Sequence, residues 1–123
     1  MLSSLKEIFE LGTIETGPGS ERIEVKSNTA KEQGLFLQHI YDHVKPTKSL
    51  EVGLAYGIST LFILEKCRQY DGNNKCHVVI EPFSWGDAAI HNIRKEGLEN
   101  FIDIRNNLSD VVIPTMYLSN ERI

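Results

Sequence analysis

The chain has 123 residues, which corresponds to one domain, and its 13 basic and 17 acidic side chains give a net charge of −4. No basic stripe indicates a nucleic-acid partner, and no apolar run approaches the ~20 residues that a membrane span needs. The N-terminus lacks the cationic start of a signal peptide, and two cysteines do not make a disulfide framework. We therefore expect a cytoplasmic protein that binds neither nucleic acid nor membrane, with Cys67 and Cys76 as small buried side chains.

The N-terminal region predicts two helices separated by a loop. Ser3 or Ser4 can cap a short helix that ends at Glu10. Residues 12–28 hold three glycines and a proline, which predicts a loop with at most a short strand at 22–25. Thr29 can cap a second helix, which ends before the proline at position 46. We divide the chain into an N-terminal helix and loop, 1–28, and a second segment, 29–123.

From residue 49 the chain alternates strands and helices. The pattern predicts strands at 49–55, 76–81 and 101–105, and helices at 58–70 and 87–97. Ser109 or Asp110 begins a last helix, with Pro114 in or near its first turn. This order predicts an α/β fold, a partial Rossmann-like doubly wound parallel sheet of about three strands with helices on both faces. Because open sheets usually have about 5–6 strands, we expect the chain to be part of a longer protein.

The main motif lies where the first of these strands turns into a helix. Glu51 stands in the strand, and Gly53 and Gly57 follow with three residues between them. Gly53 permits a sharp turn and the close approach of a ligand, and Gly57 permits close packing at the start of the helix. Free N–H groups there favour an anion, and Ser59 and Thr60 add hydroxyls in the first turn. Taken alone, this spacing is also that of an ordinary strand-to-helix turn.

A second motif lies at the end of the next strand. Glu81 follows an apolar strand, CHVVI, that has the composition of a strand buried on both faces. In doubly wound sheets the ligand lies outside the carboxyl ends of the strands, and an acidic residue there binds ribose hydroxyls. A carboxylate can accept hydrogen bonds from two neighbouring hydroxyls. The two motifs together favour a ligand with a ribose group.

These motifs, in this order, resemble the class I S-adenosylmethionine-dependent methyltransferases, and most closely their small-molecule O-methyltransferase branch. The sequence TAKEQGLFL at 29–37 is similar to the helix that this branch places before its first strand. The acid, proline and aromatic at 81–83, with HNIRKEGLENFIDI at 91–104, are similar to the branch whose second strand ends in an acid, a proline and an aromatic residue. The resemblance covers about residues 27–118 and implies the N-terminal half of such a domain.

The resemblance implies which residues hold the methionine end of the cofactor. Glu51 would orient the loop and the amino group of the cofactor. The backbone of Gly53, Ala55 and Tyr56 would line the methionine, and Ser59 would bind its carboxylate.

The nucleoside end would be held by residues that follow the next two strands. Glu81 would bind the ribose, with Pro82 and Phe83 beside the adenine, and Trp85 could form a wall of that site or pack beneath the loop. The family usually has an acid after the third strand, where this chain offers Asn107 or Ser109. The expected cofactor-binding residues are Glu51, Gly53, Ala55, Tyr56, Gly57, Ser59, Thr60, Glu81, Pro82, Phe83 and Asn107.

The resemblance assigns no catalytic residue in this chain. In metal-dependent members, the acids that bind the cation and the base follow a fourth strand, which this chain lacks. We therefore expect the chain alone to be inactive and to hold no metal. His39 and His43 have a spacing that can bind zinc, but without a third ligand in the pattern we expect a solvated helix face. The implied function is methyl transfer from S-adenosylmethionine to an oxygen or nitrogen of a small molecule, with oxygen favoured.

Two other function classes remain open. A nicotinamide or flavin oxidoreductase shares the sheet and the acid on ribose, but it expects GxGxxG where this chain has only GxxxG. A non-enzymatic interaction module is the other alternative. Besides the methyl acceptor, we expect a second copy of the chain as a partner, through paired strand edges at 49–53 and apolar surface from Leu61, Ile63 or Leu64. The rival is a monomer in which residues 117–123 cover that edge.

Overall fold

The structure, a computed structural model, describes residues 1–19, 21–26, 29–83 and 87–123. The described residues form five α-helices, five strands and one short 3-10 helix, with turns and loops between them. In chain order they are α1 (Ser3–Leu11), β1 (Thr13–Glu15), β2 (Arg22–Glu24), α2 (Lys31–Val44), β3 (Ser49–Val52), α3 (Ile58–Gln69), β4 (His77–Ile80), α4 (Asp87–Lys95), η1 (Glu99–Phe101), β5 (Ile102–Arg105) and α5 (Ser109–Leu118).

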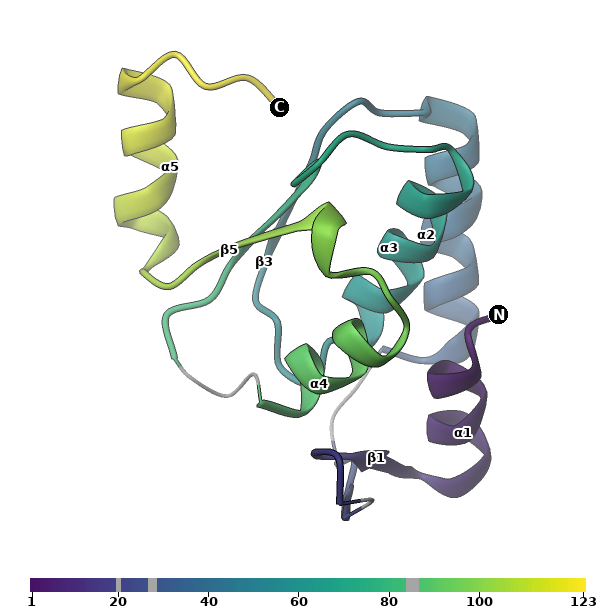
Figure 1. The fold of residues 1–123 in the computed structure, drawn as a ribbon. Coiled ribbons are helices and arrows are strands. Elements are labelled where there is room, and N and C mark those ends of the chain that lie inside the picture. The colour runs from purple at the N-terminus through teal and green to yellow at the C-terminus, as the bar shows by residue number, and fades with distance from the viewer. Residues whose placement is uncertain (20, 27–28, 84–86) are drawn as a thin grey trace.

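The three later strands form a parallel sheet in the order β3-β4-β5. Figure 1 shows α5 on one side of these strands and α2, α3 and α4 on the other. Successive residues of a strand point to opposite faces, so Val79 lies in the core beneath α3 and α4 while Ile80 packs against Val112 and Met116 of α5. The predicted α/β fold, with three parallel strands and helices on both faces, is confirmed.

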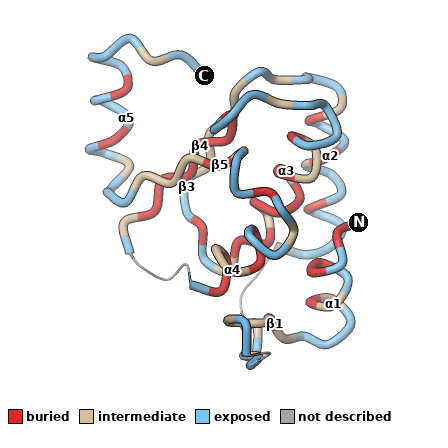
Figure 2. Tube along the Cα trace, in the orientation of Figure 1, coloured by how far each residue is buried: buried red, intermediate tan, exposed pale blue. Residues whose placement is uncertain are grey.

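The sheet face beneath α3 and α4, which we call the inner face, is closely packed. Leu61, Leu64 and Cys67 of α3 are fully buried, as the helical spacing predicts, and Cys76 is 5% exposed. The expectation that Leu61 and Leu64 contribute exposed apolar surface is therefore wrong, because both side chains face the core of this chain. Figure 2 shows the contrast between the buried α3 and the mostly exposed α5.

The N-terminal region contains more structure than its composition predicts. Residues 13–15 pair with residues 22–24 in an antiparallel hairpin, where the sequence predicts a loop with at most the second of these strands. Leu5 and Ile8 of α1 and Ile14 of β1 are buried in the same core as α3 and α4. The predicted caps are also wrong, since Leu2 and Ala30 occupy the N-cap positions of α1 and α2.

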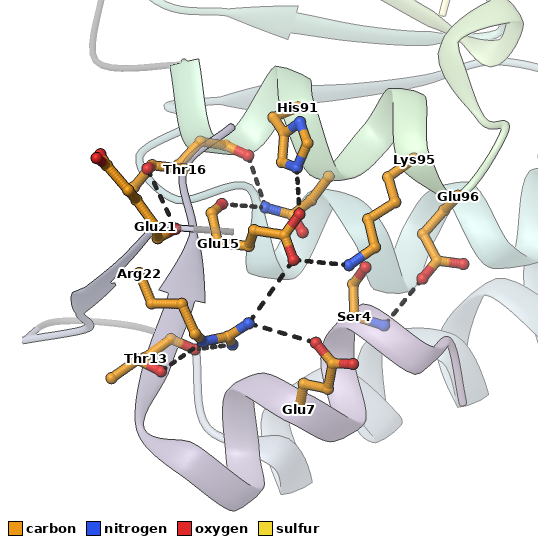
Figure 3. Close-up of polar contacts among 12 residues, drawn as sticks. Ser4, Glu7, Thr13, Glu15, Thr16, Glu21, Arg22, His91, Lys95 and Glu96 are labelled. Carbon is orange, nitrogen blue, oxygen red and sulfur yellow. Dashed lines mark hydrogen bonds and ion pairs between the residues drawn. The ribbon is translucent and has the colours of Figure 1, made fainter. Parts of the chain in front are cut away.

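A polar cluster joins the hairpin to α4, as Figure 3 shows. The carboxylate of Glu15 lies 2.7 Å from His91 Nε2 and 3.0 Å from Lys95 Nζ. Asn92 donates to the Glu15 carbonyl at 2.8 Å. Hydrogen bonds from His91 and Lys95 lower the pKa of the Glu15 carboxyl group. Arg22 of β2 reaches the same carboxylate, so three cationic or titratable side chains surround one acid.

In the part of the chain that the structure describes, no helix combines the length and the apolar character that crossing a bilayer requires.

Candidate functional site

The turn between β3 and α3 has the backbone conformation that its glycines favour. Gly53 has a φ of 93°, and the space where its Cβ would lie has no atom within 4 Å. At Gly57, with a φ of 78°, a Cβ would lie 2.8 Å from the Cβ of Ala89 in α4. The close packing predicted at Gly57 is confirmed, and Gly53 has the positive φ of a sharp turn with open space beside it; the approach of a ligand there stays a prediction.

A cavity of about 240 Å3 lies at this turn. It brings together five of the residues predicted to bind the methionine end of a cofactor. The residues that line it are Thr29, Glu51, Val52, Gly53, Leu54, Ala55, Tyr56, Ile58 and Ser59. Larger cavities lie along α4 and η1 and beside the C-terminal segment, and they contact none of the predicted residues.

Glu51 is held by hydrogen bonds from three side chains. Its Oε2 accepts from Ser59 Oγ at 2.5 Å, and its Oε1 accepts from Thr60 Oγ1 at 2.6 Å and lies 3.1 Å from His77 Nε2. Burial alone would raise the pKa of this carboxyl group, but the hydrogen bonds from His77, Ser59 and Thr60 together lower it. Glu51 is therefore a partly buried carboxylate that stays ionised. Thr60 is fully buried, so any contribution it makes to binding passes through Glu51.

Glu81 faces the same turn from the end of β4. Its Oε1 accepts hydrogen bonds from the backbone N–H groups of Leu54 at 3.0 Å and Ala55 at 3.3 Å. The residue is only 8% exposed and does not line the cavity. In this conformation Oε1 fixes the loop, while Oε2 has one long contact, from the Phe83 N–H at 3.5 Å, and keeps acceptor capacity for a hydroxyl.

Among the described residues, those predicted around an adenine do not line the cavity at the turn. Phe83 is 62% exposed, and Asn107 is exposed, with its Oδ1 accepting the N–H of Leu108 at 2.8 Å. Pro82 lies between Glu81 and Phe83 but outside the lining of the cavity. Trp85 lies outside the described residues.

The candidate zinc residues, His39 and His43, are exposed on α2. Within the described ranges, no three His, Cys, Asp or Glu side chains form a group that could hold a metal ion.

Sequence reasoning missed two residues of the site, Ser49 and His77. Both lie on the inner face, and the strand register places them side by side. Part of the signal lies in the sequence, because Ser49 and Glu51 alternate on one face of a strand and a histidine begins the otherwise apolar β4, but the contact itself depends on the strand register. Thr29, predicted only as a helix cap, lines the cavity.

A scan of protein-family models and a search of curated proteins found no match to this sequence. Among solved structures, the chain is similar to a Klebsiella pneumoniae protein proposed to be an O-methyltransferase, with a TM-score of 0.65 and 19% identity. It is also similar to cofactor-bound Rv0187 from MTB, with a TM-score of 0.61 and 19% identity. The matches cover 75% and 74% of this chain but 40% of each of the other two. The chain thus shares a fold with part of these structures.

Proposed function

We propose that this chain forms the cofactor-binding part of an S-adenosylmethionine-dependent methyltransferase that acts on the oxygen of a small molecule. The observation that carries the proposal is the position of two carboxylates at one glycine turn. Glu51 lies in the cavity below the turn, and Glu81 contacts the backbone of Leu54 and Ala55. The shared fold with an O-methyltransferase-like structure supports this assignment.

The residues at the turn fit the amino-acid end of S-adenosylmethionine. Glu51 offers negative charge to an ammonium group, and the N–H groups at the start of α3 can donate to a carboxylate. Because the Ser59 hydroxyl donates to Glu51 Oε2 in this structure, it would have to leave that oxygen to bind the ligand carboxylate. The open space at Gly53 leaves room for a ligand against the backbone. When bound, the cofactor supplies an electrophilic methyl group on its sulfonium, and the residues here bind and orient it. We assign no catalytic residue.

A nicotinamide or flavin dinucleotide fits the same turn less well. The GxGxxG motif would need glycine at the positions of Ala55 and Ile58. Ala55 has a φ of 47°, so its methyl group stands on the loop where the second glycine would leave the backbone open to a pyrophosphate.

The test is a titration of this chain followed by amide NMR, which detects weak binding. We expect S-adenosylhomocysteine to shift the signals of Gly53 to Ser59 and to raise the melting temperature, since a ligand of the native state stabilises it. NAD should do neither. Amide signals that shift with NAD alone would favour the oxidoreductase. If neither ligand shifted the signals or raised the melting temperature, the proposal would be contradicted.

Substitutions of Glu81 test whether this side chain binds the cofactor. Replacing it with alanine removes charge-assisted hydrogen bonds worth about 1.5–3 kcal/mol, which is a tenfold to hundredfold loss of affinity. Glu81→Gln keeps an acceptor for the loop N–H groups but loses the charge, so it separates ribose binding from loop geometry. Exposed Glu24→Gln is the control with the same chemical change. An affinity of Glu81→Ala equal to that of the wild type would remove Glu81 from the site.

A further inference from the structure

A histidine is buried beneath the cavity in a position that the function described so far does not use. His77 begins β4 on the inner face and is 0% exposed. A buried imidazole is costly unless both ring nitrogens have partners. Here Nδ1 lies 2.7 Å from Ser49 Oγ, and Nε2 lies 3.1 Å from Glu51 Oε1. A leucine would fill the same space without needing two hydrogen-bond partners, so packing alone does not explain a histidine at this position.

The hydrogen-bond partners of the imidazole indicate which ring nitrogen carries its hydrogen. The Glu51 carboxylate can only accept, so Nε2 carries the hydrogen that it donates to Oε1. With the hydrogen on Nε2, Nδ1 can accept from the Ser49 hydroxyl, and both contacts of the ring are satisfied. In this arrangement the hydrogen bonds run from Ser49 through His77 to the Glu51 carboxylate.

The number of acceptor sites on Glu51 then decides what it can bind. A carboxylate has about four lone-pair sites, two on each oxygen. His77 and Thr60 occupy both sites of Oε1, and Ser59 occupies one site of Oε2. Among the described residues this leaves one site on Oε2, and Glu51 lines the cavity.

We propose that His77, oriented by Ser49, is a positioning residue that holds the Glu51 carboxylate so that one oxygen is left to accept a single ammonium group in the cavity. This inference rests on the proposed function and deepens it: the ammonium is that of the amino-acid end of the cofactor. Without the His77 donor, Oε1 has a free site and the carboxylate can rotate between Thr60 and Ser59. The geometry of the remaining site on Oε2 is then lost.

The test compares two ligands that differ only in the ammonium group, S-adenosylhomocysteine and its deamino analogue. In the wild type we expect the ammonium to raise affinity by about tenfold or more, as for a hydrogen bond between charged groups. In His77→Leu this gain should disappear, while the deamino analogue binds as it does to the wild type. In His77→Gln the side-chain amide can still donate to Glu51, so most of the gain should return. Ser49→Ala should lose part of it.

A merely structural role of His77 gives a different result. Gln38 is the matched control, because it is also buried and polar, donating to the Phe62 carbonyl and to Glu65 away from the cavity. Gln38→Leu should lower stability and leave the ammonium gain intact. If His77→Leu weakened both ligands equally, or left the gain unchanged, the positioning role would be overturned. Should His77→Leu not fold, Ser49→Ala and His77→Gln decide the same question.

This outcome is distinct from failure of the proposed function. A wild type that binds neither ligand contradicts the methyltransferase assignment itself. A wild type that binds both ligands with equal affinity keeps that assignment and rejects the ammonium site. Nitrogen NMR of the imidazole gives an independent readout in the free chain, where we expect the hydrogen on Nε2; a hydrogen on Nδ1 alone would overturn the proposed orientation.

Discussion

The two faces of the parallel sheet differ in how completely they are covered. On the inner face, residues of α1, β1, α3 and α4 form one core, in which Leu61, Phe62 and Val79 are 0% exposed. On the face beneath α5, the outer face, the buried cluster consists of Ile80, Val112 and Met116, with Leu50 partly buried. Tyr117 and Leu118 of the same helix are 83% and 82% exposed.

This difference is also seen in the candidate site. Residues on the inner face or at the start of α3, such as Glu51 and Ser59, are held by hydrogen bonds in the structure as it stands. Of the residues expected at the nucleoside end, Phe83 and Asn107 beside the adenine are exposed, whereas Glu81 is 8% exposed and held by the loop. The half of the site that adjoins the complete core is organised, and the half beyond it is open. The stability of the fold and the order of the site should therefore depend on the same face.

The largest effect should come from the inner core. Phe62→Ala removes a fully buried ring that packs against Phe9, and we expect it to lower the free energy of unfolding by about 3–5 kcal/mol. Leu118→Ala, on the outer helix, should change it by less than about 0.5 kcal/mol. Urea unfolding followed by circular dichroism measures both. Similar losses in the two variants would show that α5 packs more tightly than its exposure indicates.

A second, smaller effect concerns the buried carboxylate. Glu51→Gln loses charge-assisted hydrogen bonds and should lower the unfolding free energy at neutral pH by about 1–3 kcal/mol. Because the pKa of Glu51 is lowered in the folded chain, its contribution is present above the ordinary value of 4.5 and is lost as the pH falls below it.

The gap in stability between wild type and Glu51→Gln should therefore narrow as the solution is acidified below that value. Unfolding curves over a pH series test this sign. A gap that stays constant through the acidic range would mean that the loss comes from packing and not from the charge of Glu51.

The strands and helices of the sheet region could be predicted because local and long-range signals agree there. The run HVVI at 77–80 is buried on both faces, and helical spacing in α3 places Leu61 and Leu64 in the core. The hairpin at 13–24 was missed because three-residue strands have little alternation, and its stability comes from contacts with α1 and α4.

The site could be predicted only where residues close in sequence act together. Gly53, Gly57 and Ser59 follow one another along a single turn, so their spacing carries the signal. The contact of Ser49 with His77 depends on the register of two strands, which the sequence does not specify. On α2, Leu35, Ile40 and Val44 have the helical spacing of a buried face, yet they are exposed while Tyr41 is buried, which is likewise a property of the packing and not of the pattern.

A still smaller effect is expected on the outer face, where the C-terminal segment turns back. Glu121 makes ion pairs with Lys48 and Arg105, and hydrogen bonds from Arg105 and Lys48 lower its pKa to about 2. Its side chain is 23% exposed, so solvent weakens these pairs, and Glu121→Gln should cost less than about 1 kcal/mol at neutral pH.

The pH dependence again follows from the lowered pKa. The contribution of Glu121 is complete above its ordinary value of 4.5 and fades as the pH falls towards about 2. Unfolding at neutral pH in low and high salt tests the electrostatic origin, since salt screens exposed pairs. A cost that is unchanged by salt would point to packing of the segment instead.

The last prediction concerns the edge that lies between the two faces. Within the described residues β3 pairs with β4 alone, through the N–H groups of Ser49 and Gly53 among others. Because alternate residues point their backbone groups to opposite sides, Leu50 and Val52 present theirs to the open edge. We expect a second copy of the chain to pair there antiparallel, about a two-fold axis near Glu51, giving a sheet of six strands.

Val52 is 60% exposed on this edge, and a lysine there blocks strand pairing in many proteins. Val52→Lys should therefore convert the dimer to a monomer in light scattering, with a change in the stability of the chain below about 0.5 kcal/mol. Val44→Lys is the matched control, because the same residue type is 61% exposed on α2. Loss of the dimer with Val44→Lys alone would move the interface to α2. A wild type that is monomeric at every concentration would reject the edge pairing and favour a monomer in which the C-terminal segment, held by Glu121 to Lys48, shields the start of β3.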